Sequence, residues 1–140
     1  MKVLITGGAG YLGTVLTEEI LNRFPYAKVI VYDNLMYKQD GLFSFFKYPK
    51  DRFEFVYGDV RDKNSLLEQL QKLDKDNDYV IPLAAIVGFP ACARDEKLAT
   101  AVNFEHVKYI VQSTRCRIIY PNTNSGYGVS DGEAHCTEET

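Results

Sequence analysis

A glycine-rich turn joins the first apolar strand of this chain to its first helix, and it constrains the fold more than any other feature. The run Lys2-Val3-Leu4-Ile5 is typical of a short buried strand, and Gly7, Gly10 and Gly13 follow it in G-x-x-G-x-x-G spacing. An amphipathic run over residues 11–23 comes next and predicts a helix. Such a turn offers backbone N–H groups and the positive end of a helix dipole to an anion, and glycine lets a pyrophosphate come close. The opening segment therefore predicts a dinucleotide-binding β-α-β unit.

The second strand strengthens this interpretation, because glycine triplets also occur in tight turns and close helix packing for structural reasons alone. The apolar run Lys28-Val29-Ile30-Val31-Tyr32 leads directly into Asp33, which stands about 20 residues after Gly13. A carboxylate at this place can accept hydrogen bonds from the hydroxyls of an adenosine ribose and repels a 2′-phosphate. NAD is thus favoured over NADP as the cofactor. The alternative is that Asp33 only forms a turn at a strand end.

Strands and helices alternate along the chain, which predicts the α/β class: a Rossmann-like, doubly wound parallel sheet, incomplete at its C-terminal side. The segment Leu42-Phe43-Ser44-Phe45-Phe46 could add a short helix. Five strands are expected near residues 2–6, 28–32, 53–57, 79–83 and 117–120, and three helices near residues 11–23, 62–73 and 95–114.

Composition excludes several classes of function. The 140 residues fit one domain, and a net charge of −3 gives no electrostatic footprint for nucleic acid. No apolar run approaches the ~20 residues of a membrane span, and a strand at residue 2 leaves no room for a signal peptide, so a cytoplasmic location is expected. Cys92, Cys116 and Cys136 are expected to be free thiols, and His106 and His135 are too isolated to suggest a metal site.

Two further motifs close the predicted third and fourth strands. In Gly58-Asp59-Val60-Arg61-Asp62, the Asp59 carboxylate and the Val60 N–H can meet the edge of an adenine ring, and Asp62 is also plausible as a helix N-cap. In Leu83-Ala84-Ala85 the small side chains would let a cofactor lie close to the backbone, although packing alone could demand them too.

These motifs, taken in order with Tyr120-Pro121-Asn122-Thr123-Asn124-Ser125-Gly126-Tyr127-Gly128, resemble the extended short-chain dehydrogenase/reductases, and most closely their NAD-dependent nucleotide-sugar epimerase/dehydratase branch. The resemblance covers essentially the whole chain. It implies an enzyme that transfers a hydride transiently at a sugar hydroxyl, takes a nucleotide sugar as substrate, and forms a homodimer.

The resemblance also implies roles for individual residues. The catalytic Ser/Thr position of the family falls on Thr123, whose hydroxyl would hydrogen-bond the sugar and help to move a proton, although a threonine can also simply cap a strand end. The cofactor positions group by the part of NAD they would contact: Gly7, Gly10, Tyr11 and Leu12 at the pyrophosphate, Asp33 and Asn34 at the adenosine ribose, Asp59 and Val60 at the adenine, Leu83, Ala84 and Ala85 at the middle of the cofactor, and Asn103 near the strand ends.

The chain departs from the family pattern at three places. Pro82 stands where histidine is frequent and should locally alter the hydrogen-bond ladder of its strand, and His106-Val107 replaces the usual Gly-Thr. The acidic residues of the sugar 4,6-dehydratases are replaced by Asn124 and Ser125, which favours an epimerase or reductase.

The family's Tyr-x-x-x-Lys pair is missing, since no tyrosine of this chain has a lysine four residues later. Counted from Thr123, the expected tyrosine falls beyond Thr140. Residues 1–140 are therefore expected to be the NAD-binding domain at the N-terminal side of a longer enzyme, without its substrate subdomain, and inactive alone. A non-catalytic NAD(H)-binding or regulatory module is the alternative.

Overall fold

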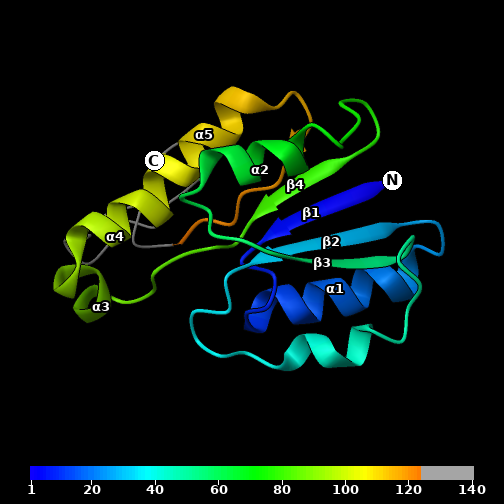
Figure 1. The fold of residues 1–140 in the computed structure, drawn as a ribbon, viewed down its shortest axis with the longest axis horizontal. Helices are drawn as coiled ribbons and strands as arrows, with labels where there is room; N and C mark the ends of the chain where they lie inside the picture. Colours follow the sequence, from blue (N-terminus) through cyan, green and yellow to red (C-terminus); the bar gives the residue numbers. More distant parts are fainter. Residues whose placement is uncertain (124–140) are drawn as a thin grey trace, which may run out of the picture.

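The computed structural model describes residues 1–123, which form a five-stranded parallel sheet in the order β3-β2-β1-β4-β5. The sheet lies between two layers of helices, with α1 and η1 on one face and α2 and α5 on the other (Figure 1). The strands are β1 (Lys2–Thr6), β2 (Lys28–Asp33), β3 (Phe53–Tyr57), β4 (Tyr79–Pro82) and β5 (Arg117–Ile118). The helices are α1 (Tyr11–Arg23), the 3₁₀ segment η1 (Gly41–Phe45), α2 (Lys63–Leu70), α3 (Phe89–Arg94), α4 (Glu96–Thr100), the π-helical segment η2 (Ala101–Glu105) and α5 (His106–Ser113). This arrangement confirms the predicted Rossmann-like class.

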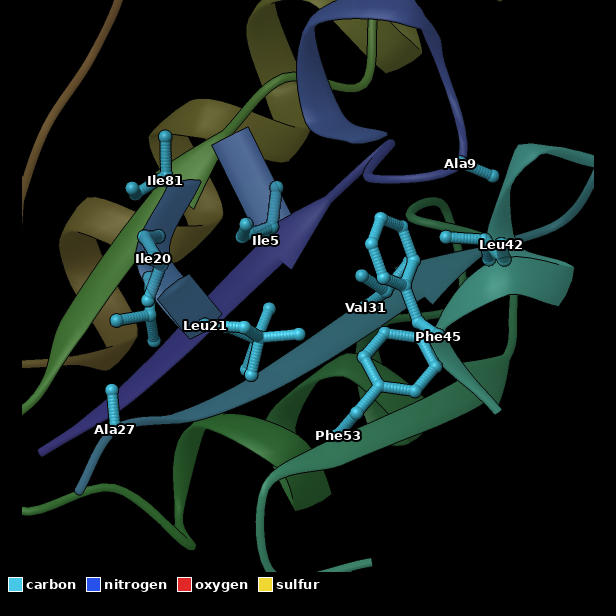
Figure 2. Packing of buried hydrophobic residues seen from close by; sticks show 12 residues of the cluster. Ile5, Ala9, Ile20, Leu21, Ala27, Val31, Leu42, Phe45, Phe53 and Ile81 are labelled. Atoms are coloured by element: carbon cyan, nitrogen blue, oxygen red, sulfur yellow. The ribbon is translucent and has the colours of Figure 1, made fainter. Parts of the chain in front are cut away.

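Each central strand contributes to two apolar cores, because neighbouring residues of a strand point to opposite faces of the sheet. In β1, Ile5 packs with the residues of α1 and η1, whereas Leu4 packs with those of α2 and α5. Figure 2 shows the first of these cores, in which Ile20 and Leu21 of α1 and Phe45 of η1 pack against the strands. Both Leu4 and Ile5 are fully buried, and burying such a side chain stabilises a fold by about 1.5–3 kcal/mol. Cores on both faces explain why the strands read as continuous apolar runs.

Proline residues end the ladder between β4 and β5, so β5 is shorter than the predicted 117–120. Val80 pairs with Ile118, and the N–H of Ile119 donates to the Val80 carbonyl at 3.0 Å. The next pair of bonds in a parallel ladder would need the N–H groups of Pro82 and Pro121, which do not exist. The predicted disturbance at Pro82 is thus confirmed, and it falls on the side of β5.

The prediction of one continuous helix over residues 95–114 is wrong. The segment divides into α4, the π-helical η2 and α5, and α3 precedes it without having been predicted. Asp95 ends α3 and starts α4, where its carboxylate accepts a hydrogen bond from the Leu98 N–H at 2.9 Å.

The helix predicted over residues 62–73 is shorter in the structure, since α2 ends at Leu70. Asp62 is its N-cap, as the alternative interpretation had it. Its carboxylate accepts from the N–H groups of Asn64 and Ser65, each at 3.1 Å.

Within residues 1–123, the side chains offer no group of three His, Cys, Asp or Glu that could hold a metal ion, and no helix is long and apolar enough to cross a membrane. Cys92 and Cys116 are free thiols, as predicted, while Cys136 and His135 lie outside the described residues.

His106 has a structural position that the sequence did not reveal. Its side chain is buried between α5 and β1, with Nε2 at 3.0 Å from the Thr6 hydroxyl and Nδ1 at 3.1 Å from the Val102 carbonyl. Since a carbonyl can only accept, Nδ1 carries the proton and Nε2 accepts from Thr6. Burial lowers the pKa of His106 to about 4.

Stability should therefore fall on mild acidification. The unfolded chain takes up a proton on His106 near pH 6.5, whereas the folded chain resists it down to a pKa of about 4. Between about pH 7 and about pH 5 the free energy of unfolding should drop by about 2 kcal/mol on this account. Urea unfolding at the two pH values measures the drop. The His106→Gln variant should lose most of this dependence and the His135→Gln control should keep it; an unchanged pH dependence in His106→Gln would contradict the assignment.

Candidate cofactor-binding site

A cavity of about 740 Å³ opens at the carboxyl ends of the strands. This is the edge of an open parallel α/β sheet at which ligands bind. All the residues expected from the sequence line this one cavity: Gly7, Gly10, Tyr11, Leu12, Asp33, Asn34, Asp59, Val60, Leu83, Ala84, Ala85, Asn103 and Thr123. The structure thus brings together residues that are spread over the length of the chain.

The three glycines of the turn serve different purposes. Gly7 has φ +69°, and a Cβ there would collide with the backbone of Leu83 and Ala84, so this glycine lets β1 turn against the end of β4. A Cβ on Gly13 would collide with the backbone of Gly8. At Gly10, the N-cap of α1, a Cβ would meet only the Gly7 carbonyl oxygen at 3.3 Å. The space beside Gly10 therefore belongs to the cavity, next to the N-terminal N–H groups of α1.

Asp33 is held against the glycine turn. It is only 6% exposed, and its two carboxylate oxygens accept hydrogen bonds from the N–H of Ala9 at 3.0 Å and the N–H of Leu35 at 2.8 Å. The carboxylate ties the end of β2 to the turn and to its own loop, which gives it a structural role. Each oxygen keeps a second lone pair, so Asp33 can still accept a hydrogen bond from a ligand.

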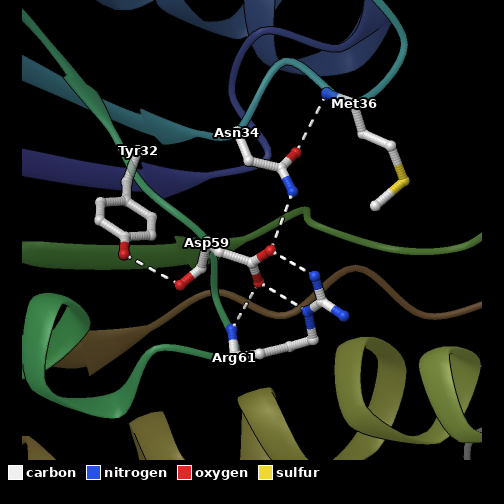
Figure 3. Close-up of polar contacts among 5 residues, drawn as sticks. All are labelled: Tyr32, Asn34, Met36, Asp59 and Arg61. Atoms are coloured by element: carbon white, nitrogen blue, oxygen red, sulfur yellow. Dashed lines mark hydrogen bonds and ion pairs between the residues drawn. The ribbon is translucent and has the colours of Figure 1, made fainter.

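Asn34, Asp59 and Arg61 form a hydrogen-bonded chain across the ends of β2 and β3 (Figure 3). The Asn34 amide donates to Asp59 Oδ2 at 3.2 Å. The Arg61 guanidinium holds both oxygens of the same carboxylate, with Nε to Oδ1 at 2.9 Å and Nη2 to Oδ2 at 2.7 Å. These hydrogen bonds lower the pKa of Asp59 to about 2, so this wall of the cavity carries a fixed, ionised acceptor. The sequence motif contained Arg61, but nothing in it indicated this role.

Tyr32 forms a hydrogen bond with the backbone of Asp59. Its hydroxyl donates toward the Asp59 carbonyl at 3.0 Å and lies 3.0 Å from the Ser65 hydroxyl, as Figure 3 shows for the first contact. Burial raises the pKa of Tyr32 above its ordinary value. A Cβ on Gly58 would collide with the Tyr32 ring, so this glycine is needed for packing.

Asn103 acts on the loop after β4. Its Oδ1 accepts from the Ile86 N–H at 2.7 Å and its Nδ2 donates to the Ile86 carbonyl at 3.0 Å. These two hydrogen bonds satisfy the backbone N–H and carbonyl of Ile86, which lies after the end of β4 and has no strand partner among the described residues. Asn103 sits in η2, and π-helical turns of this kind are frequent at functional sites. The contact positions the segment that follows Leu83-Ala84-Ala85 along the cavity wall.

Thr123 lines the cavity from the segment that follows β5, and the residue is exposed. Its N–H donates to Asn122 Oδ1 at 2.8 Å. Asn124 and Ser125, on which the choice between epimerase and dehydratase depends, lie outside the described residues.

Several cavity residues were not expected from the sequence. Some lie close in the sequence to predicted residues, which is the signal that could have found them: Tyr32, Gly58, Pro82, Ile86, Val87 and Gly88. Met36, Tyr37 and Gln39 come from the loop after β2, where the sequence has no pattern to follow.

Comparison with known proteins decides the family. The model of the NAD dependent epimerase/dehydratase family matches residues 3–140. The chain belongs to this family. It is 32% identical over 133 residues to CDP-paratose 2-epimerase of Salmonella typhi, covering 91% of the chain and 38% of that protein.

Solved structures agree with the family assignment. UDP-glucose 4-epimerase from Brucella ovis in complex with NAD is 26% identical, with a TM-score of 0.71, covering 91% of this chain and 37% of that one. dTDP-glucose 4,6-dehydratase from Bacillus anthracis in complex with NAD is 25% identical, with a TM-score of 0.72. The match covers 100% of this chain and 43% of that one. This member of the family therefore spans less than half the length of these relatives.

Proposed function

We propose that this chain is the NAD-binding part of a nucleotide-sugar epimerase-type oxidoreductase. The observation that carries the proposal is that Gly10, the N-cap of α1, lines the cavity, and that a Cβ there would touch only the Gly7 carbonyl oxygen, at 3.3 Å. The Gly7 and Gly13 positions have sufficient structural reasons, whereas the space at Gly10 is explained by a ligand that comes close to the backbone. The family description and the NAD complexes of the two relatives above support NAD as that ligand.

The residues present fit NAD along its length. The N–H groups at the start of α1 would hold the pyrophosphate, and Asp33 with Asn34 would accept hydrogen bonds from the adenosine ribose. The ionised Asp59 and the Val60 N–H would bind the adenine edge, and residues 83–85 with Asn103 would border the middle of the cofactor. The chemistry that bound NAD supplies is reversible acceptance of a hydride from a sugar hydroxyl carbon.

For the substrate, we infer a nucleotide sugar, since the relatives above are named for CDP-, UDP- and dTDP-linked sugars. Thr123 would hydrogen-bond the reacting sugar oxygen and share in the proton transfer. We favour epimerisation over dehydration because Asn124 and Ser125 supply no carboxyl group for eliminating water. A non-catalytic NAD(H)-binding module stays the second candidate, since the chain has no Tyr-x-x-x-Lys pair. Turnover of a nucleotide sugar by the whole protein would decide between them.

Replacing Asp33 with asparagine should weaken NAD binding about tenfold and narrow the preference for NAD over NADP. The substitution removes a charged acceptor for the ribose hydroxyl and the repulsion of a 2′-phosphate. Isothermal titration calorimetry with both cofactors gives the ratio of affinities.

Asp33→Asn also disturbs the hydrogen bonds to Ala9 and Leu35 and should lower the stability of the fold. The ratio of the NAD and NADP affinities is therefore the decisive quantity. Asp51→Asn, at an exposed position before β3, makes the same change in net charge and should leave the ratio alone. An NAD/NADP ratio that stays constant in Asp33→Asn would place this carboxylate outside the binding site.

A further inference from the structure

Gln39 stands out among the residues that line the cavity because its side-chain carboxamide has no hydrogen-bond partner within residues 1–123. Its Oε1 is buried from water and unpaired, although the side chain borders the cavity. Leaving a buried amide oxygen unsatisfied costs about 1–3 kcal/mol. The side chain therefore has an unmet capacity for hydrogen bonding that a ligand could use.

The loop that carries Gln39 is held in an unusual conformation. Leu35 and Lys38 have φ +53° and +55°, in the left-handed region that residues with a side chain seldom adopt. The Lys38 N–H donates to the Leu35 carbonyl at 2.8 Å, and Asp33 accepts from the Leu35 N–H. Strain of this kind persists where the surrounding structure over-determines it, and it is concentrated at ligand-binding sites.

The place of Gln39 in the fold limits what it can contact. Two residues later, a Cβ on Gly41 would come within 2.9 Å of Thr14 Cγ2, so the loop returns against the first turns of α1. Gln39 thus belongs to the loop that runs from the end of β2, where Asp33 is, to this contact with α1, and it lines the same cavity as Asp33. A neutral carboxamide offers one acceptor and two donors, which matches a hydroxyl that both donates and accepts.

We propose that Gln39 binds a hydroxyl of the adenosine ribose of NAD and is a specificity-determining residue of this site. The inference rests on the proposed NAD binding and adds a ribose contact beside Asp33, whose oxygens are already partly occupied by Ala9 and Leu35. On binding, the carboxamide turns from its buried position to the ligand and gains the hydrogen bond that it lacks.

Calorimetric titration of the full chain with NAD and with its 2′-deoxyadenosine and 3′-deoxyadenosine analogues tests the contact. Gln39→Leu should weaken NAD binding about five- to tenfold. The same variant should bind the analogue that lacks the contacted hydroxyl as well as the wild type does. Gln39→Glu keeps the acceptor and should still discriminate NAD from that analogue. Gln112→Leu, an identical exchange at an exposed site on α5, should change none of the affinities.

The outcomes separate this inference from the proposal beneath it. If wild type binds NAD and Gln39→Leu weakens all three ligands equally, or none of them, Gln39 makes no ribose contact and only the inference fails. A folded wild type that binds no NAD overturns the proposed function, and the inference with it. Circular dichroism and thermal unfolding of each variant establish that it is folded.

Discussion

Gly10→Val is expected to reduce NAD affinity by on the order of 100-fold or more while the chain stays folded. A valine side chain at this N-cap would occupy the space between the turn and the cavity and keep the pyrophosphate from the N–H groups of α1. Losing two charge-assisted hydrogen bonds at about 1.5 kcal/mol each accounts for a loss of that size. Titration calorimetry measures the affinity, and thermal unfolding measures the stability.

Gly7→Ala is the informative contrast, because the same turn is affected for a different reason. A methyl group at Gly7 would meet the backbone of Ala84 at a positive φ, so this variant should lose about 3 kcal/mol of stability. The two variants should therefore differ: Gly10→Val loses NAD binding, and Gly7→Ala loses stability. Wild-type affinity in Gly10→Val would remove the turn from the binding site.

Thr123→Val, made in the whole protein, should lower the rate of sugar conversion by on the order of 10²–10⁴. The exchange keeps the size of the side chain and removes the hydroxyl that would hydrogen-bond the reacting oxygen. NAD affinity should change little, since Thr123 follows β5, and β4 separates that strand in the sheet from β1 and its glycine turn. Steady-state kinetics with calorimetry separates the two effects.

Thr100→Val serves as the matched control, because it makes the same exchange at an exposed position at the end of α4. Its rate should equal that of the wild type. A Thr123→Val enzyme that works at full speed would take this residue out of the mechanism and strengthen the alternative of a module without catalysis.

The sheet could be predicted from the sequence because its strands carry the signal within themselves. Residues such as Leu4 and Ile5 are buried on opposite faces of the sheet. An unbroken apolar run therefore indicates a strand in the middle of a parallel sheet that is covered on both faces. The end of β5 is different, since it depends on the missing N–H groups of Pro82 and Pro121, which lie far apart in the sequence and come together only where β4 pairs with β5. The π-helical segment η2, between α4 and α5, carries Asn103, whose hydrogen bonds with Ile86 are a tertiary contact that no local pattern reports.

The site divides in the same way. The glycine turn and the acids at strand ends could be found because chain order and spacing alone bring them to one edge of the sheet. The role of Arg61 could not, because it follows from a side-chain geometry that fixes Asp59. Gln39 could not be predicted either, because its distinguishing feature is a side-chain oxygen without a hydrogen-bond partner among the described residues. Such a feature exists only in the folded structure.

A chemical-shift map of the ¹⁵N-labelled chain during titration with NAD tests the central claim most directly. We expect the largest shifts at the amides of Gly10, Tyr11 and Leu12, at Val60, and at residues 83–85, which border one cavity. The amides at the opposite ends of the strands should change little. Saturating NAD that shifts none of these amides, or that shifts a separate surface instead, would contradict the assignment of this cavity as the cofactor site.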